Sequence, residues 1–431
     1  MPDAPHQLIT KAGEILSHDQ VRVFVIDACP LNDYRGQRVL LITPDGTRTA
    51  PIGLFFKALH SHLHGVVRKF DVMIALGTHP PMSDDAVNAR VEITPAERAS
   101  IYRDVEFINH EWDNPAALRE LGVIPAAEIS ALSGGRFAMD VPVHINRRIF
   151  DYDRIIICGP VFPHEVVGFS GGNKYLFPGV AGPGILNFFH WLGAVVTNPM
   201  IIGNKWTPVR RIVDRAGAMV AVPKLCFCLV VTGHGRLAGS FAGTPEQAWD
   251  AASDLSRDLH IDYKDRPFHT VLSCAPTMYD ELWVAGKCMY KLEPVVADGG
   301  ELIIYAPHLR EISLTHGGHI RRLGYHCRDY FLKQWDQFKD EPWSTLAHST
   351  HVHGIGTYDE KTGVETPRVR VTLATGLSKE QCREINLGYR DWRTIDVESY
   401  ANREAEGVLL VREAGERLFH LRRKPKWAGG A

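Results

Sequence analysis

One short stretch of the chain concentrates residue types that bind anions, form covalent bonds and transfer protons. It runs from Pro163 to Lys174 and reads PHEVVGFSGGNK. Successive glycines allow backbone N–H groups to approach an anion such as a phosphate. A Walker P-loop is excluded, because Asn173 and Tyr175 flank the lysine where that motif has Gly and Ser or Thr. The stretch therefore predicts an anion-binding loop of another kind.

Lys174 stands at the start of an uncharged segment that extends to Lys205. Burial in apolar surroundings lowers the pKa of a lysine amine and makes it a usable nucleophile or covalent tether. The alternative is a lysine that extends from a Gly-rich turn into solvent. The segment is long enough to span a bilayer, but the prolines and glycines at 178–184 favour a buried segment beside a site.

Three histidines lie in predicted strand-end loops or in the uncharged segment: His79, His164 and His190. An imidazole transfers protons near neutral pH and also binds nickel, zinc or copper. Each of them alone also fits a hydrogen-bonded structural residue. Arg48 ends a further strand-end loop, and its planar guanidinium suits either a substrate carboxylate or a surface ion pair.

Other histidines have spacing that resembles metal sites. His351 and His353 are expected to share one face of a strand, which leaves a zinc-dependent hydrolase as an alternative function. His60, His62 and His64 fall on a predicted helix, where this spacing points to different faces, and we interpret them as surface residues. A second alternative is a non-catalytic protein that binds a nucleotide or cofactor through its Gly-rich loop.

The candidate residues follow short apolar strands. The runs Arg38–Ile42, Val72–Leu76 and Arg154–Cys158 each lead into a loop that contains Gly or Pro. Continuous apolar runs of this kind suit parallel strands that are covered on both faces, so the predicted class is α/β. Ligands gather at the carboxyl ends of such strands, which places Asp45–Arg48 and His79 at a site.

Two Rossmann-like α/β domains with mostly parallel sheets are expected, with the active site in the cleft between them. A polar stretch places the boundary near residue 265. Residues 1–265 would bind the cofactor, residues 266–414 would form a smaller domain, and the tail at about 415–431 would be able to pack back on the first. The second domain is expected to contain a helix at 279–296 and strands at 301–305 and 369–373.

Composition excludes several classes of protein. The 431 residues include 48 Lys and Arg against 50 Asp and Glu, a net charge of −2, so nucleic acid and anionic membranes are not expected partners. Eight cysteines without a Cys-x-x-Cys pair indicate no disulfide scaffold. With no visible signal peptide, a reduced, cytoplasmic protein is expected.

Together these motifs resemble the nickel-dependent lactate racemase family. The most specific similarity is the Gly-rich lysine motif, with a histidine before it and another after it. The similar positions are Asp45–Arg48, Gly77–His79, His164, Gly168–Lys174, Pro178–Gly182, His190, Lys287 and Asp298–Gly300. They follow the family's order from about residue 45 to 300.

The resemblance implies an isomerase, a racemase or epimerase of 2-hydroxy acids that works by reversible hydride transfer. Its cofactor would be a nickel-pincer nucleotide, a pyridinium mononucleotide whose ring carbon and two sulfur substituents hold nickel. The implied roles are thioamide attachment at Lys174, nickel ligation by His190, acid/base catalysis by His79 and His164, cofactor contacts from Asp45, Gly46, Thr47 and Arg48, and substrate contacts from Arg48 and Lys287. The implied partners are a small 2-hydroxy acid and the proteins that synthesise the cofactor.

The chain departs from the family pattern at two places. Gly46 stands where the family often has His, and Trp283-Val284 stands where it has Tyr-Gln. The second change removes polar groups near the substrate. Lactate is therefore a less favoured substrate. A related short aliphatic, a larger aliphatic or an aromatic 2-hydroxy acid, or a sugar acid, is favoured more.

Overall fold

The structure is a computed structural model that describes residues 4–11, 14–47 and 49–423. It divides into two compact units. Unit 1 comprises residues 1–162, 169–186 and 208–259, and unit 2 comprises residues 163–168, 187–207 and 260–431. The boundary near residue 265 stays a prediction, and each unit is described by itself.

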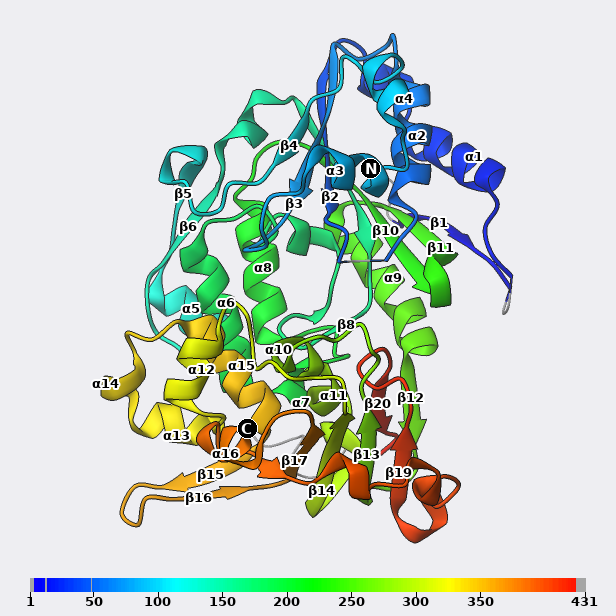
Figure 1. Cartoon of the computed structure of the whole chain (residues 1–431). Helices are drawn as coiled ribbons and strands as arrows, with labels where there is room; N and C mark the ends of the chain where they lie inside the picture. The colour runs from blue at the N-terminus through cyan, green and yellow to red at the C-terminus, as the bar shows by residue number, and fades with distance from the viewer. Residues whose placement is uncertain (1–3, 12–13, 48, 424–431) are drawn as a thin grey trace. The chain divides into compact units, whose positions relative to one another are not determined.

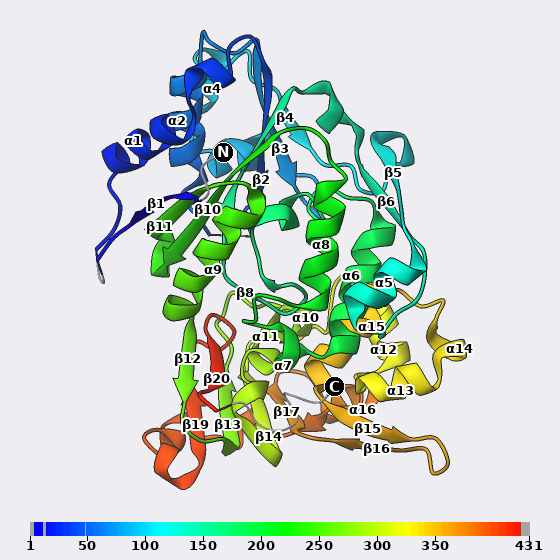
Figure 2. The same ribbon diagram turned by 180° about the vertical axis from the view of Figure 1, so that it is seen from behind.

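Unit 1 is built on a seven-stranded sheet with the order β1-β11-β10-β7-β2-β3-β4 (Figure 1). The strands are β1 His6–Ile9, β2 Arg38–Pro44, β3 Lys69–Ala75, β4 Phe107–Asn109, β7 Arg154–Pro160, β10 Lys224–Thr232 and β11 Arg236–Gly243. Neighbours from β10 to β4 pair in parallel, whereas β11 is antiparallel to both β10 and β1, which Figure 2 shows from behind. The three predicted apolar runs are β7, β2 and β3, side by side in the sheet, which confirms the α/β class.

Apolar residues on both faces of these strands explain why the sheet is covered on both sides. On one face Val39 and Leu41 of β2 join a core with Phe55 and Phe56 of helix α2. Leu40 and Ile42, which alternate with them along β2, point to the other face of the sheet and are equally buried. The helices in or entering unit 1 are α1 His18–Ala28, α2 Ile52–Leu63, α3 Asp84–Arg90, α4 Pro95–Ala99, α5 Ala126–Ser133, α6 Pro183–Val196, α8 Pro208–Ala218 and α9 Pro245–His260. Two short strands, β5 Leu118–Ile124 and β6 Val141–Asn146, form a separate antiparallel pair.

Unit 2 contains a five-stranded sheet, order β18-β17-β14-β13-β19, in which every neighbouring pair is parallel. Its strands are β13 Phe268–Cys274, β14 Val296–Ala306, β17 Arg370–Thr375, β18 Gly388–Tyr389 and β19 Val408–Val411. Further pairs are β8 Pro163–His164 with β9 Gly168–Phe169, β12 Ile261–Lys264 with β20 Leu418–Leu421, and β15 Gly356–Asp359 with β16 Val364–Pro367. The helices are α7 Asn198–Ile201, α10 Leu282–Ala285, α11 Lys287–Tyr290, α12 Gly317–Leu323, α13 Arg328–Lys333, α14 Trp335–Phe338, α15 Trp343–His353 and α16 Lys379–Glu384.

The prediction of a single helix over 279–296 was wrong. The segment folds as α10, α11 and a 3₁₀ turn at Glu293–Val295. Gly286 separates the two helices, and a Cβ there would lie 2.8 Å from Val352 Cγ2 and 3.2 Å from His348 Nε2. Gly286 keeps helical backbone angles, φ −50° and ψ −28°, so the packing of α15 restricts this position to glycine without unwinding the backbone there.

The prediction that His351 and His353 share a strand face was also wrong, because both lie at the end of helix α15. Residues two apart on a helix point in different directions. The zinc-hydrolase alternative thereby loses the geometry on which it was based. The prediction that His60 is a surface residue was also wrong. His60 is buried on α2, with its ring 4.8 Å from that of Tyr102.

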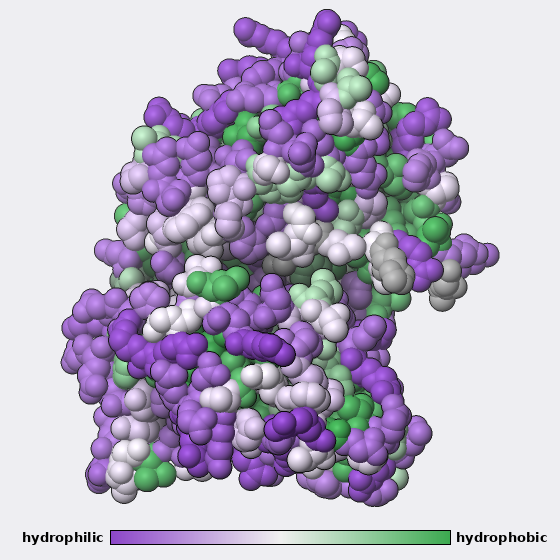
Figure 3. Space-filling model, viewed as in Figure 1, coloured by the Kyte–Doolittle hydropathy of each residue, from purple (hydrophilic) through white to green (hydrophobic). Residues whose placement is uncertain are grey.

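The uncharged segment 175–204 folds largely into α6 and α7, and Phe189, Trp191 and Leu192 of α6 are fully buried. Within the described residues, none of the helices combines the length and the apolar character that crossing a membrane would need. The face drawn in Figure 3 is largely hydrophilic, with small, separate hydrophobic patches.

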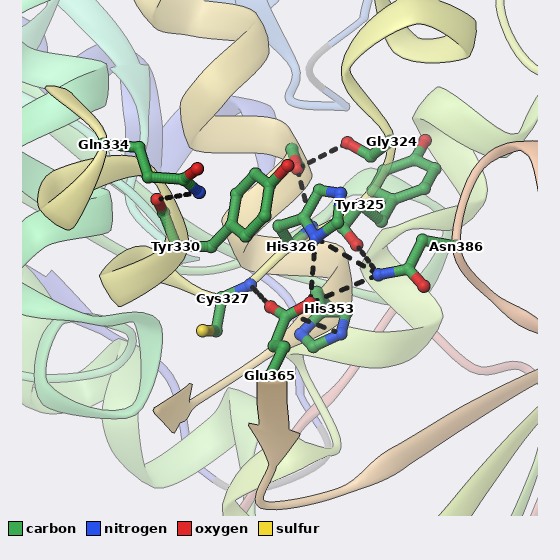
Figure 4. A network of polar contacts seen from close by, with 10 residues as sticks. Gly324, Tyr325, His326, Cys327, Tyr330, Gln334, His353, Glu365 and Asn386 are labelled. Atoms are coloured by element: carbon green, nitrogen blue, oxygen red, sulfur yellow. Dashed lines mark hydrogen bonds and ion pairs between the residues drawn. The ribbon is translucent and has the colours of Figure 1, made fainter. Parts of the chain in front are cut away.

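His353 belongs to a polar network that ties the β15–β16 hairpin to α15 (Figure 4). Glu365 of β16 lies 2.8 Å from His326 Nδ1 and 3.8 Å from His353 Nε2, and it accepts a 2.5 Å hydrogen bond from the Cys327 backbone N–H. Asn386 donates to Glu365 at 3.3 Å. Burial alone would raise the pKa of Glu365, but the hydrogen bond from His326 and the charge of His353 hold this pKa at about 2.

We predict that Glu365→Gln lowers the free energy of unfolding by about 1–3 kcal/mol at pH 7, because it leaves buried donors without an anionic partner. The folded-state pKa lies below the ordinary glutamate value. The ionised side chain therefore stabilises the fold above about pH 4.3 and loses this contribution as the pH falls towards 2. Urea unfolding followed by circular dichroism at several pH values measures both effects. The exposed Glu360→Gln on the same hairpin is the matched control; equal losses in both variants contradict the prediction.

Candidate active site

An aspartate–histidine pair lies at the carboxyl ends of two neighbouring strands in unit 1. Asp45 follows β2 and His79 follows β3, and the distance from His79 Nδ1 to Asp45 Oδ2 is 2.6 Å. The other Asp45 oxygen accepts hydrogen bonds from the Thr47 backbone N–H at 3.2 Å and the Thr47 hydroxyl at 2.5 Å. A carboxylate on Nδ1 fixes the ring and its tautomer, which leaves the Nε2 lone pair to accept a proton.

Lys174 lies on a 3₁₀ turn, Gly172–Tyr175, that packs on β2, β7 and β10 of the same sheet. Gly171 precedes the turn with φ +89°, and a Cβ there would lie 2.4 Å from Val161 Cγ2, so only glycine fits. The Gly77 backbone N–H, two residues before His79, donates to the Gly179 carbonyl at 2.9 Å. The lysine segment and the loop that carries His79 are thus tied together in unit 1.

Arg210 of α8 and Trp249 of α9 hold this turn in place through hydrogen bonds. The Arg210 guanidinium donates to the Gly171 carbonyl at 3.0 Å and to Asp214 at 3.2 Å, and it stacks 3.7 Å from the Trp249 ring. The Trp249 indole N–H donates to the Ser170 carbonyl at 3.0 Å. Neither support was predicted, because both residues are far from the motif in sequence and carry no motif of their own.

His164 and His190 belong to unit 2. The Val166 backbone N–H donates to His164 Nδ1 at 3.1 Å, so the neutral His164 ring carries its proton on Nε2. Glu165 Oε2 lies 3.5 Å from the same nitrogen. His190 lies on α6, one turn before Gly193, where a Cβ would come within 3.3 Å of Val166. Close packing at this glycine brings the helix of His190 against the His164 segment.

Two further histidines of α15 lie in the same unit and were not predicted as parts of this site. Burial lowers the pKa of His351 to about 4 and that of His348 to about 3, so both rings are neutral at pH 7. Glu165 and His190 are the ionisable groups whose charges act on His351. Among the described residues, both ring nitrogens of His351 and Nδ1 of His348 are buried without a hydrogen-bond partner. The unusual density of histidine at 348–353 was the available sequence signal.

Trp283, one of the departures from the family pattern, is covered on both faces. Its ring stacks 4.1 Å from the His316 ring and 3.8 Å from the His348 ring. His348 Nε2 also bonds to the Trp283 carbonyl at 2.8 Å. Lys287 lies just beyond on α11, with its amine 5.0 Å from the centre of the Tyr279 ring.

The predicted residues are distributed between both units. Unit 1 contains Asp45, Gly46, Thr47, His79 and Lys174, and unit 2 contains His164, His190, Trp283, Val284 and Lys287. Arg48 lies outside the described residues, so its predicted contacts stay a prediction. Within the part of the chain that the structure describes, no group of three or more His, Cys, Asp or Glu side chains is arranged to hold a metal ion.

Comparison with known proteins adds a match to one family domain and to two curated proteins. Residues 26–200 match the lactate racemase N-terminal domain. The lactate racemase of Thermoanaerobacterium thermosaccharolyticum is 22% identical over 289 residues, which are 65% of this chain and 62% of that protein. The lactate racemase of Lactiplantibacillus plantarum is 23% identical over 275 residues, 62% of this chain and 59% of that protein. The chain thus matches about three-fifths of the length of these curated relatives.

Two solved structures are similar over nearly the whole chain. A protein from Thermotoga maritima has a TM-score of 0.82 and 32% identity, covering 96% of this chain and 100% of that one. The lactate racemase apoprotein from T. thermosaccharolyticum has a TM-score of 0.70 and 18% identity, with 93% of each chain covered, and shows the shared fold. The N-terminal region of the chain thus matches the lactate racemase N-terminal domain, its curated relatives are lactate racemases, and its fold is that of the lactate racemase apoprotein.

Proposed function

We propose that this protein is an isomerase that racemises or epimerises a 2-hydroxy acid by reversible hydride transfer. The observation that carries the proposal is the 2.6 Å contact between Asp45 and His79 in the region that matches the family domain. It supplies an oriented general base, which removal of a hydroxyl proton requires. Taking the hydrogen on carbon as a hydride avoids a carbanion beside the substrate carboxylate.

The residues present fit a nickel-pincer nucleotide as cofactor. Lys174 offers an amine for covalent attachment on a turn that Arg210 and Trp249 hold in place. Gly171 and Gly172, just before this amine, are buried and let the turn pack closely on Val161, Arg210 and Trp249. His190 offers one imidazole, a ligand that nickel accepts. When bound, the group supplies an acceptor for the hydride.

The two acid/base histidines are held in opposite ways. His79 has its Nδ1 on a carboxylate, so its Nε2 accepts the hydroxyl proton and Asp45 stabilises the imidazolium that forms. His164 has its Nδ1 on the Val166 N–H, so its Nε2 carries a proton to donate. Two enantiomers present their hydroxyls on opposite sides, and one imidazole per side therefore serves both directions. Lys287, with Arg48, would hold the substrate carboxylate.

We predict that Asp45→Asn lowers kcat by about 10²–10⁴-fold without removing the cofactor, because an amide stabilises neither the required tautomer nor the imidazolium. Chiral chromatography of a 2-hydroxy acid incubated with each protein measures kcat, and intact mass confirms an equal load on Lys174. Asp84→Asn, an exposed change on α3, is the control and should retain full activity. Normal turnover by Asp45→Asn contradicts the role assigned to the pair.

A separate prediction concerns cofactor attachment and nickel. After expression in a host that makes the cofactor, the wild-type protein should carry added mass on Lys174 and about one nickel per chain. Lys174→Arg should lose the added mass, whereas His190→Ala should keep the mass and lose most of the nickel. Intact-mass spectrometry and elemental analysis measure both. An unmodified Lys174 in the wild type, or zinc that His190→Ala retains, rules out this cofactor assignment.

A further inference from the structure

Helix α15 contains three imidazoles for which the proposed reaction has no use, and one of them, His353, already lies 3.8 Å from Glu365. In the described residues, both ring nitrogens of His351 and Nδ1 of His348 are buried and have no hydrogen-bond partner. An unsatisfied buried polar nitrogen costs about 1–3 kcal/mol, so native proteins retain few of them. Three such nitrogens on neighbouring turns of one helix indicate that a ligand supplies the missing partner.

These imidazoles lie beside residues assigned to the substrate. Helix α15 packs on α11 so closely that a Cβ at Gly286 would lie 3.2 Å from His348 Nε2, and Gly286 immediately precedes Lys287. His351 is within electrostatic range of Glu165 and His190 in the same unit. The pair therefore lies in unit 2 against the helix that carries Lys287.

The surroundings argue against an aromatic side chain on the substrate. Trp283 is the large aromatic residue at the position where the family has Tyr, but His316 and His348 cover both faces of its ring. No face of this indole is left for stacking a substrate ring. The buried polar atoms of His348 and His351 that lack a hydrogen-bond partner are imidazole nitrogens instead.

A hydroxyl group fits these nitrogens better than a second carboxylate. Both rings are buried, and a neutral imidazole offers one N–H donor and one lone pair. A hydroxyl both donates and accepts, so it can satisfy either nitrogen. A carboxylate only accepts, and it would face the remaining lone pairs with its own charge.

We propose that His351, assisted by His348, binds a hydroxyl on C3 or beyond, and that the preferred substrates are polyhydroxylated 2-hydroxy acids. This specificity rests on the proposed function. Lactate, with a methyl group at this position, would leave the imidazole nitrogens unpaired. A site built to bond a hydroxyl discriminates strongly against the analogue that lacks it.

The test compares matched substrates with the nickel-loaded enzyme: glycerate against lactate, and 2,3,4-trihydroxybutanoate against 2-hydroxybutanoate. In each pair kcat/KM should be at least about tenfold higher for the hydroxylated acid, the effect of one hydrogen bond of about 1.4 kcal/mol. His351→Phe should erase this preference and change kcat/KM for lactate less than about threefold. His351→Gln retains a donor and an acceptor and should restore part of the preference. His319→Phe, a partly exposed histidine of α12, is the control.

The possible results distinguish a wrong substrate preference from a wrong proposed function. If lactate, phenyllactate or malate is inverted as well as glycerate or better, the inference is wrong and the proposed function stands. The same holds if His351→Phe keeps the wild-type preference. If the loaded enzyme inverts none of these acids, the proposed function and the inference both fail.

Discussion

The contact between Asp45 and His79 is the interaction on which the account depends. It exists because β2 and β3 are neighbouring parallel strands, so the loops that follow them meet at one edge of the sheet. The carboxylate is largely buried and accepts two further hydrogen bonds from Thr47, which fixes its own position. A positioned carboxylate converts an ordinary histidine into an oriented base, and the lysine turn is anchored to the same sheet.

The same side chain acquires different chemistry from different backbone surroundings. A carboxylate holds Nδ1 of His79, whereas a backbone N–H holds Nδ1 of His164. These partners set opposite tautomers, and hence a proton acceptor and a proton donor, with no change of residue type. His348 and His351 extend the series: burial keeps both rings neutral, which suits them to bind a hydroxyl group rather than to take part in proton transfer.

The local sequence predicted the parallel strands well, because runs such as Val39–Ile42 are apolar on both faces and end at Gly or Pro. It also located the lysine turn, since Gly171 and Gly172 are needed there for close packing. It failed where distant packing decides. Position 286 must be glycine because α15 lies against it, and His351 was assigned to a strand because three-residue patterns do not distinguish strand from helix. The supports of Arg210 and Trp249 depend on contacts that no spacing reveals.

The most direct test follows the hydrogen on C2 of the substrate. A single enantiomer of a turned-over 2-hydroxy acid, labelled with deuterium at C2, is incubated with the nickel-loaded enzyme in ordinary water, and the inverted product is analysed by mass spectrometry. Hydride transfer predicts that the product retains most of its deuterium. Free exchange of the label with water at each inversion would mean that the hydrogen leaves as a proton, and the account would be wrong.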